Sequence, residues 1–268
     1  MKVLRVVSCM LAFFFVIPQC VVFAYDGTKM NITSIKNDEG IVGVRVDTDS
    51  DKRLRIGIHA AASENEYFFS YAKEEGEIDV PLIFGNDIYS VNLFEELSNK
   101  YYTLLDSYDV DLQMNDYDSI YLSSSVIVPW SGAEKTVAKA AALTKNEKND
   151  VDKFFALYDY VTENTIYDMQ KTVETGYRSS PDEILADGKG ICLDIAVLLA
   201  SMLRSTGIKC KLVYGQASEI EGLHSWNEVY LKNKWIIVDP TKDAILYDSS
   251  TPYKYYKHPE DYKGMYYF

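Results

Sequence analysis

The sequence is short of positive charge. It has 27 Lys and Arg against 40 Asp and Glu, which gives a formal net charge of −13 over 268 residues. A surface this acidic repels the phosphate backbone of nucleic acids, so we expect no nucleic-acid partner. The chain also lacks internal repeats and long low-complexity segments. Its organisation must therefore be inferred from the order of ordinary helices and strands.

Cysteine is scarce as well, with four residues in the whole chain. Cys9 and Cys20 lie in an apolar N-terminal segment, which leaves Cys192 and Cys210 in the remainder. Two cysteines in a protein outside the cell usually form a disulfide. Here Cys192 opens an expected helix that ends near Ser205, roughly 20 Å away, and Cys210 follows that far end. Because bridged Cα atoms lie within about 7 Å of each other, we expect a free thiol at Cys192.

The first residues have the profile of a secretory signal. Lys2 and Arg5 precede an apolar stretch over residues 6–24, which contains no acid and ends on a small residue. Cleavage there would start the mature chain near Tyr25 and leave 25 Lys and Arg against 40 Asp and Glu. We therefore predict a signal peptide over residues 1–24 and a secreted or cell-surface protein.

Two alternatives for this segment are membrane anchors. An uncleaved spanning helix is disfavoured because Pro18 interrupts the apolar stretch, which is barely as long as a helix needs to cross a bilayer. A lipid anchor on Cys20 is disfavoured because Gln19 occupies the position where a lipidation signal has a small residue. Contact with a membrane is therefore expected only through the signal segment.

Residues 25–128 form the first of two expected domains, since roughly 100 to 150 residues is a common domain size. Short alternating or β-branched runs are separated by polar turn clusters, a pattern that predicts an all-β, sandwich-like domain. Strands are expected at residues 31–36, 41–47, 53–60, 67–72, 77–84, 88–93 and 101–112. His59, the single histidine of this half, lies in a strand pattern and is interpreted as structural.

Residues 129–268 form the second expected domain, which has α+β character. Helices are predicted at residues 134–143, 150–163, 181–186 and 191–205, and strands at 209–217, 224–231 and 234–239. Ser180 and Glu183 have the spacing of a capping box for the short third helix. The helix over 191–205 is apolar almost all round, so it is expected to be buried. A tyrosine cluster near the C-terminal end is expected to pack on the core, with stacking on glycans as the alternative.

Cys192 is the candidate nucleophile. A loop with two glycines, Gly188 and Gly190, delivers it to the first turn of the buried helix. There the unpaired main-chain amides and the positive end of the helix dipole favour a thiolate. A cysteine on a buried helix is more often a small apolar filler, so its position alone leaves both interpretations open.

His224 and Asp239 become neighbours in an expected hairpin. Lys232-Asn233 is the best candidate for a two-residue turn between the last two strands. Asp239 then faces Trp226, and alternation along the strands places His224 on the same side. The two residues become diagonal neighbours about 7 to 8 Å apart at the backbone, which an imidazole and a carboxylate can span. A histidine oriented by an acid, with a thiol at a helix N-terminus, is what nucleophilic catalysis requires.

These motifs resemble the core of transglutaminase-like domains. The order Cys, His, Asp is accompanied by Trp226, Trp235 and Asp239-Pro240, and the likeness covers about residues 130–245. The segments that carry it are 158–161, 166–168, 190–194, 202–207, 224–229 and 235–241. The β-rich half resembles the N-terminal regions of secreted bacterial members.

The resemblance implies a papain-like fold and a cysteine enzyme that acts on amide or carboxamide groups of a protein or peptide. Cys192 would attack the carbonyl to form a thioester, His224 would accept and return the proton, and Asp239 would orient the imidazole. Capture of the thioester by an amine gives crosslinking. Capture by water gives deamidation or proteolysis.

Two more residues are candidates for the site. An oxyanion needs two donors, of which one would be the main-chain amide of Cys192. Tyr167 is the candidate for the second donor, with core packing as the alternative. Trp226 is the candidate for a substrate-pocket wall or a shield of the imidazole, whereas Trp235 is interpreted as core. Asp194 is interpreted as an acid that favours the helix dipole.

We expect no cofactor and no metal. The calcium-loop pattern of alternating acids with glycine is missing, so the metal dependence of animal transglutaminases is not carried over. Leu193-Asp194-Ile195 and Ser225 depart from the residues usual in relatives and would alter the substrate pocket while leaving the triad in place. The alternatives are a cysteine protease or cell-wall peptide amidase on the same triad, and, from another class, a noncatalytic surface-binding module.

Overall fold

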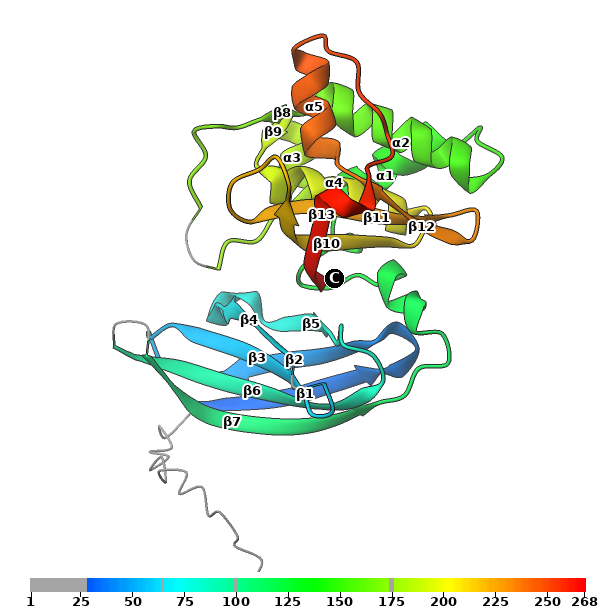
Figure 1. Ribbon diagram of the computed structural model, residues 1–268. Helices are drawn as coiled ribbons and strands as arrows, with labels where there is room; N and C mark the ends of the chain where they lie inside the picture. The colour runs from blue at the N-terminus through cyan, green and yellow to red at the C-terminus, as the bar shows by residue number, and fades with distance from the viewer. Residues whose placement is uncertain (1–27, 64, 99–100, 174–175) are drawn as a thin grey trace, which may run out of the picture.

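The computed structural model of the protein describes residues 28–268 apart from residues 64, 99–100 and 174–175. The predicted signal peptide and the predicted start of the mature chain near Tyr25 lie outside the described residues. Figure 1 shows β-sheets in the first half of the chain and a mixed unit of helices and strands beside them. In the described part of the chain, no helix is long and apolar enough to span a membrane.

The first half forms two antiparallel sheets, as predicted. One has the order β1-β2-β5, with β1 (Lys29–Lys36), β2 (Ile41–Asp47) and β5 (Glu77–Pro81). The other has the order β4-β3-β6-β7, with β4 (Glu66–Tyr71), β3 (Leu54–Ala60), β6 (Asp87–Ser98) and β7 (Tyr101–Leu112). Alternating apolar residues give the sheets buried faces, with Met30 and Val44 contributed by one sheet and Ile56 and Val91 by the other.

Two strand boundaries differ from the prediction by more than two residues. The strand expected over residues 77–84 ends at Pro81, and the apolar residues that follow are buried outside any strand. Their pattern therefore reflects packing rather than strand pairing. The strand expected over residues 88–93 continues to Ser98, because β3 and β7 both pair with it.

The second half is an α+β unit, as predicted. A four-stranded antiparallel sheet has the order β12-β11-β10-β13, and β8 pairs with β9 in parallel. The strands are β8 (Ile166–Tyr167), β9 (Lys189–Gly190), β10 (Cys210–Ala217), β11 (His224–Leu231), β12 (Lys234–Val238) and β13 (Tyr262–Tyr267). The helices are α1 (Glu134–Thr144), α2 (Asp150–Asn164), α3 (Pro181–Asp187), α4 (Cys192–Ser205) and α5 (Pro240–Asp248). Short 3-10 helices are η1 (Asn37–Glu39), η2 (Lys73–Glu75), η3 (Tyr117–Leu122) and η4 (Pro259–Asp261).

Helix α4 lies at the centre of this unit. Every residue from Asp194 to Arg204 is buried, as its apolar composition predicts. The helix packs on β10 and β11 and is also contacted by α1, α2 and α3. These contacts on several sides fix the position of its N-terminus, which carries Cys192.

The predicted capping box at the start of α3 is wrong. Pro181 does open the helix, but the side chain of Ser180 makes no capping hydrogen bond. The acid that acts as a cap is Asp182, whose carboxylate accepts the main-chain N–H groups of Lys135 and Thr136 at the start of α1. The first turn of α3 therefore caps the neighbouring helix instead of its own.

Helix α5 and strand β13 were not indicated by the sequence pattern. Asp239 caps α5, because its Oδ1 accepts the main-chain N–H of Lys242 at 3.0 Å. β13 adds a fourth strand beside β10, and its dense tyrosines obscure the alternation that would predict it. The tyrosine cluster packs against the core, as expected, with the Tyr255 ring 5.5 Å from that of Tyr158.

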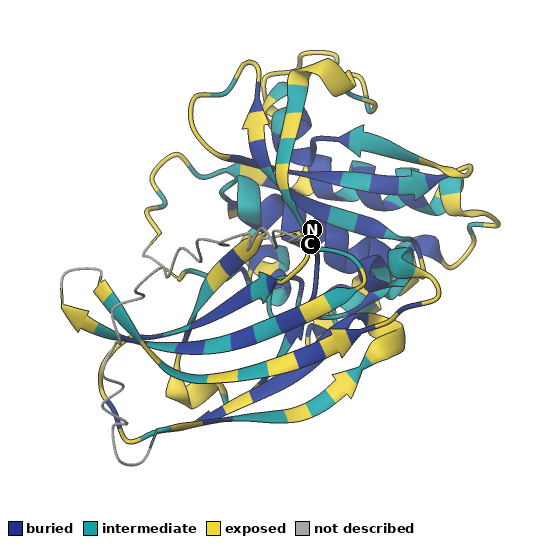
Figure 2. Ribbon diagram, turned by 60° about the horizontal axis from the view of Figure 1, so that its bottom comes forward, coloured by how far each residue is buried: buried dark blue, intermediate teal, exposed yellow. Residues whose placement is uncertain are grey.

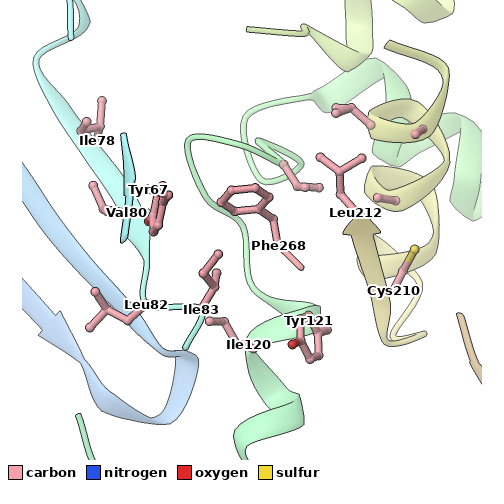
Figure 3. Close-up of a cluster of buried hydrophobic side chains, with 14 of the residues drawn as sticks. Tyr67, Ile78, Val80, Leu82, Ile83, Ile120, Tyr121, Cys210, Leu212 and Phe268 are labelled. Atoms are coloured by element: carbon pink, nitrogen blue, oxygen red, sulfur yellow. The ribbon is translucent and has the colours of Figure 1, made fainter. Parts of the chain in front are cut away.

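The two halves share one hydrophobic core. Figure 2 shows buried residues in strands of both halves, and Figure 3 shows Phe268 between Tyr67 of the β half and Leu212 of β10. The Phe268 ring lies 5.3 Å from the Tyr67 ring and 5.7 Å from the Tyr214 ring. The predicted boundary between residues 128 and 129 stays a prediction, because the core runs across it.

Candidate active site

Cys192 is the first residue of α4, and a glycine turn leads to it. Gly188 ends α3 with a φ of 64°, which favours glycine. A Cβ on Gly190 would lie 2.6 Å from the Asp194 Cβ, so no larger residue fits there without a shift. The Cys192 thiol is half-buried and free, and Cys210 is buried and free.

Strands β11 and β12 form the predicted hairpin. The turn residues Lys232-Asn233 have φ values of 51° and 63°, as a two-residue turn of this kind requires. The strands pair in the predicted register, with Asn227 opposite Val238. Asp239 follows directly and therefore lies opposite Trp226.

The hairpin brings His224 and Asp239 into contact. The His224 Nε2 lies 2.8 Å from the Asp239 Oδ2, with the imidazole 3% exposed and the carboxylate 0% exposed. The Cys192 thiol lies close enough to the imidazole that each group shifts the pKa of the other. Because Nε2 contacts the carboxylate, Nδ1 is the ring nitrogen left for other partners. The structure thus brings all three predicted triad residues together.

The charges of the three groups support one another. Burial alone would lower the pKa of His224, but the hydrogen bonds to Asp239 and Cys192 outweigh it and raise that pKa to about 9. Burial opposes ionisation of Cys192, but the bond to His224 and two main-chain amides lower its pKa. Asp239 behaves likewise, since its hydrogen bonds outweigh burial and lower its pKa. The arrangement favours a thiolate beside an imidazolium.

Tyr262 of β13 is a residue of the site that the sequence did not indicate. Its hydroxyl donates to the Asp239 Oδ2 at 3.0 Å, so the carboxylate that orients His224 is itself held by a second donor. The Tyr262 ring also packs edge-on against Trp226 at 5.1 Å. The one available signal was the tyrosine cluster, which indicated packing and did not single out this hydroxyl.

Asp194 has a larger role than an interaction with the helix dipole. Its fully buried carboxylate accepts the Lys171 ammonium at 2.7 Å, the Tyr177 hydroxyl at 2.7 Å and the main-chain N–H of Ile191 at 2.9 Å. These bonds join the loop before α3 to the turn that carries Cys192. Lys171 and Tyr177 lie in an irregular segment, where no periodicity could have indicated them.

Tyr167 and Trp226 lie near the triad in different ways. Burial raises the pKa of Tyr167, and the charge of Cys192 raises it further, which puts its hydroxyl within electrostatic reach of the thiol. Trp226 is 1% exposed, and its ring lies nearly parallel to the His224 imidazole with centroids 6.2 Å apart. The structure thus places Trp226 where it covers the imidazole, and the pocket-wall role stays a prediction.

Other candidate positions lie away from the triad. His59 is in β3 of the β half, in a different sheet from the strands that carry His224. Trp235 packs against Tyr121 and Tyr230 with centroids 5.3 and 5.2 Å away. Within the described residues, no group of three or more His, Cys, Asp or Glu side chains could hold a metal ion.

A family model matches part of the second half of the chain. Residues 137–240 match the family described as the transglutaminase-like superfamily. Kyphoscoliosis peptidase of Mus musculus is 27% identical over 158 residues, which are 55% of this chain and 23% of that protein. The human protein of the same name is 28% identical over 158 residues, with the same shares. The similarity therefore spans about a quarter of the length of these relatives.

Solved structures similar to this chain include two bacterial proteins. The periplasmic domain of TgpA from Pseudomonas aeruginosa has a TM-score of 0.41 at 15% identity, covering 75% of this chain and 90% of that one. Calcium-bound LapG of Legionella pneumophila has a TM-score of 0.32 at 21% identity, covering 49% of this chain and 83% of that one.

Proposed function

Because residues 137–240 form a domain of the transglutaminase-like superfamily, we propose that the protein is a cysteine enzyme acting on amide or carboxamide groups of a protein or peptide. Cys192 is the nucleophile, His224 the general base and acid, and Asp239 the residue that orients the imidazole. The observation that carries the proposal is the buried contact of 2.8 Å between the His224 Nε2 and the Asp239 Oδ2, with a Cys192 thiol whose pKa is lowered by His224.

The first step forms a thioester. The Cys192 Sγ attacks the carbonyl carbon, and the oxygen takes the electron pair of the C=O bond. The main-chain amide of Cys192 is the proposed first donor to this oxyanion, because the first N–H groups of a helix have no partner within it, and the Tyr167 hydroxyl is the proposed second. When the oxyanion collapses, the C–N bond breaks and the His224 imidazolium gives its proton to the leaving nitrogen.

The second step decides the product. Water that loses a proton to His224 releases an acid, which amounts to proteolysis or deamidation. A primary amine that does the same forms a new amide, which is a crosslink. The names of the mouse and human relatives contain the word peptidase, which supports hydrolysis of a peptide bond as the first reaction to assay.

The proposed location of the protein rests on its N-terminal segment. Lys2, Arg5 and the apolar stretch over residues 6–24 support export and a secreted or cell-surface enzyme. Peptides of the cell wall belong to the substrates that such a location would offer. No cofactor enters the proposed reaction.

The test is a paired assay of the mature protein with β-casein as the substrate. One arm measures incorporation of a fluorescent primary amine, and the other measures new N-termini by mass spectrometry. We expect a product in at least one arm that disappears in Cys192→Ala and His224→Ala. Cleavage without amine incorporation would identify a protease. Turnover that persists in Cys192→Ala would contradict the proposed nucleophile.

A control separates a poor substrate from an inactive site. Iodoacetamide labels a reactive thiol without any recognition of a substrate, so it reports on Cys192 alone. Rapid labelling without turnover of casein would direct the search to other peptides. Slow labelling together with no turnover would contradict an enzyme and favour a noncatalytic binding module.

A further inference from the structure

A cleft of about 500 Å³ lies between the two halves of the molecule. Its β-half wall is strand β4, including Glu66, Phe68 and Ser70. Its opposite wall includes Tyr177 and Tyr214 of the second half. A cleft of this size is in the range that binding sites usually have.

Strand β4 is an edge strand, and its outer edge faces this cleft. β4 pairs with β3 alone, and the N–H of Ala60 on the β3 side bonds to the carbonyl of Asn65. Because main-chain groups alternate along a strand, Glu66, Phe68 and Ser70 direct theirs outward. The contact of Arg178 with the Ser70 carbonyl agrees with this assignment.

The outward groups of β4 differ in whether another described residue bonds to them. Arg178 occupies the Ser70 carbonyl and so closes one end of the edge. Among the described residues, the main-chain groups of Glu66 and Phe68 that point outward make no hydrogen bond. The Phe68 side chain is 48% exposed beside them. The open part of the edge thus combines unpaired amides and carbonyls with an exposed aromatic ring.

In contrast to β4, the edge strand β5 of the other sheet is covered by another segment of the chain. β5 is the edge strand of the three-stranded sheet, and the main-chain N–H of Val126 bonds to the carbonyl of Asp79 at 2.7 Å. The chain between the two halves thus pairs with β5. No such segment pairs with the outer edge of β4 at Glu66 and Phe68 among the described residues.

The opposite wall of the cleft connects to the nucleophile. The Tyr177 hydroxyl bonds to Asp194, which holds the turn before Cys192. Burial raises the pKa of Tyr214, and the charges of Cys192 and Asp194 raise it further, so this wall lies within electrostatic reach of the thiol. The cleft lining includes none of the triad residues, so Tyr177 and Tyr214 are what connects the cleft to the turn before Cys192.

We propose that the outer edge of β4 binds an extended polypeptide segment of the substrate and presents an adjoining part of it to Cys192. The segment adds a strand to the sheet and pairs with the main-chain groups of Glu66 and Phe68. An apolar side chain of the segment packs beside Phe68 and Tyr214. This inference rests on the proposed function and adds that the protein binds its substrate as an extended chain.

The chemistry of the edge favours a polypeptide over a glycan. A row of alternating N–H and C=O groups with the spacing of a strand is matched by another main chain, which has the same spacing. A second copy of this protein could offer its own β4 in the same way. Pairing of two β4 strands would give a dimer. The amount of dimer rises with protein concentration, and the test below detects this dependence.

The test uses the Cys192→Ala protein and a display library of random dodecapeptides as the probe. Enriched peptides are labelled, and their dissociation constants are measured by fluorescence polarisation. We expect Phe68→Pro to weaken binding about tenfold or more, because proline removes the outward N–H. Proline is tolerated on an edge strand where the N–H faces outward.

Two variants control for the substitution. Asp111→Pro places a proline on β7, the opposite edge of the same sheet, at a position that points away from β6, and binding should not change. Phe68→Ala keeps the N–H and removes the ring, so its loss of binding measures the side chain alone. If Phe68→Pro unfolds, amide exchange at Glu66 and Phe68 in the Cys192→Ala protein replaces it, and added peptide should slow that exchange.

Three results would overturn the inference. The first is that no peptide is enriched from the library. The second is that the enriched peptides bind the Phe68→Pro and Cys192→Ala proteins equally well. The third is that amide exchange in β4 slows with protein concentration and does not respond to peptide. Labelling of Cys192 by iodoacetamide in the wild-type protein is measured separately. Rapid labelling with no peptide on β4 contradicts this inference alone, whereas slow labelling contradicts the proposed function.

Discussion

At the scale of single residues, the reactivity of the site depends on whether Cys192 or His224 holds the proton that they share. The His224 pKa is raised from 6.5 to about 9 and the Cys192 pKa is lowered, so the two shifts have opposite signs. Between the lowered thiol pKa and about 9, the ion pair of thiolate and imidazolium is the favoured state. Above about 9 the imidazolium loses its proton, and the thiolate then lacks its cationic partner.

The first prediction concerns the pH dependence of alkylation. The rate of Cys192 labelling by iodoacetamide should rise at a pH below the ordinary thiol value of 9.0 and then level off. In His224→Ala the rise should move to a higher pH, with labelling at pH 7 at least about tenfold slower. Cys210 is the internal reference, because burial raises its pKa to about 12. Equal labelling of both cysteines would contradict the activated thiol.

The second prediction concerns Tyr262 as a positioning residue. Tyr262→Phe removes one donor to the Asp239 carboxylate and leaves the ring in place. We expect a loss of about 1 kcal/mol in the free energy of unfolding. We also expect Cys192 labelling at pH 7 to slow several-fold, which corresponds to the free energy of one lost hydrogen bond, about 1 kcal/mol. Tyr256→Phe, on the exposed part of the same tail, is the matched control. A purely structural role would lower stability and leave the pH profile of labelling unchanged.

At the scale of elements, the N-terminus of α4 is fixed by a loop that belongs to no helix or strand. Lys171 and Tyr177 both reach Asp194, which also accepts the main-chain N–H of Ile191. Gly190 makes room for this acid. The turn, the loop and the helix therefore act as one unit that positions Cys192.

The third prediction tests this unit with Asp194→Asn. The amide keeps the shape of the side chain but cannot accept all three donors, and it leaves the Lys171 charge without its counter-ion. We expect a loss of about 1 to 3 kcal/mol in the free energy of unfolding, limited because Lys171 is partly exposed to solvent. Chemical denaturation measures the loss, and Cys192 labelling should slow with it.

The control for this variant comes from another helix. Asp152 is the third residue of α2, as Asp194 is the third residue of α4, but it is exposed. Asp152→Asn should therefore change the free energy of unfolding by about 0.5 kcal/mol or less. Similar losses for both variants would mean that Asp194 interacts with its helix end alone.

At the scale of the whole molecule, one buried guanidinium ties three segments together. Arg204 at the end of α4 donates to the main-chain oxygens of Ser123, Cys210 and Phe268 at 2.7, 2.9 and 2.7 Å. Burial lowers its pKa to about 10, so it remains charged at neutral pH. Ser123 lies between the two halves of the chain, so Arg204 fixes how they meet.

The fourth prediction replaces this residue. Arg204→Met keeps most of the length of the side chain and leaves three buried carbonyl groups without donors. We expect a loss of about 2 to 4 kcal/mol in the free energy of unfolding. Arg53→Met is the control, because the Arg53 side chain is largely exposed and the change should stay within about 0.5 kcal/mol. If Arg204→Met lowered the free energy of unfolding no more than Arg53→Met does, the two halves would pack without the help of Arg204.

The sequence by itself determined what depends on local pattern. Alternation along strands and a two-residue turn predict the β11–β12 hairpin, so His224 and Asp239 could be paired without knowledge of the fold. Continuous apolar composition predicts that α4 is buried, and the order of the motifs predicts the domain. Each of these inferences uses residues close together in the chain or a spacing that repeats.

The tertiary structure decided the partners that are remote in the chain. Tyr262 reaches Asp239 because β13 returns to the edge of the sheet beside β10, and Lys171 reaches Asp194 across an irregular loop. Neither contact has a periodic signal, since it depends on where whole elements come to lie. The cleft at β4 is the same kind of feature, because its two walls belong to the two halves of the chain. Packing between elements sets such contacts, and a local pattern of residues cannot encode them.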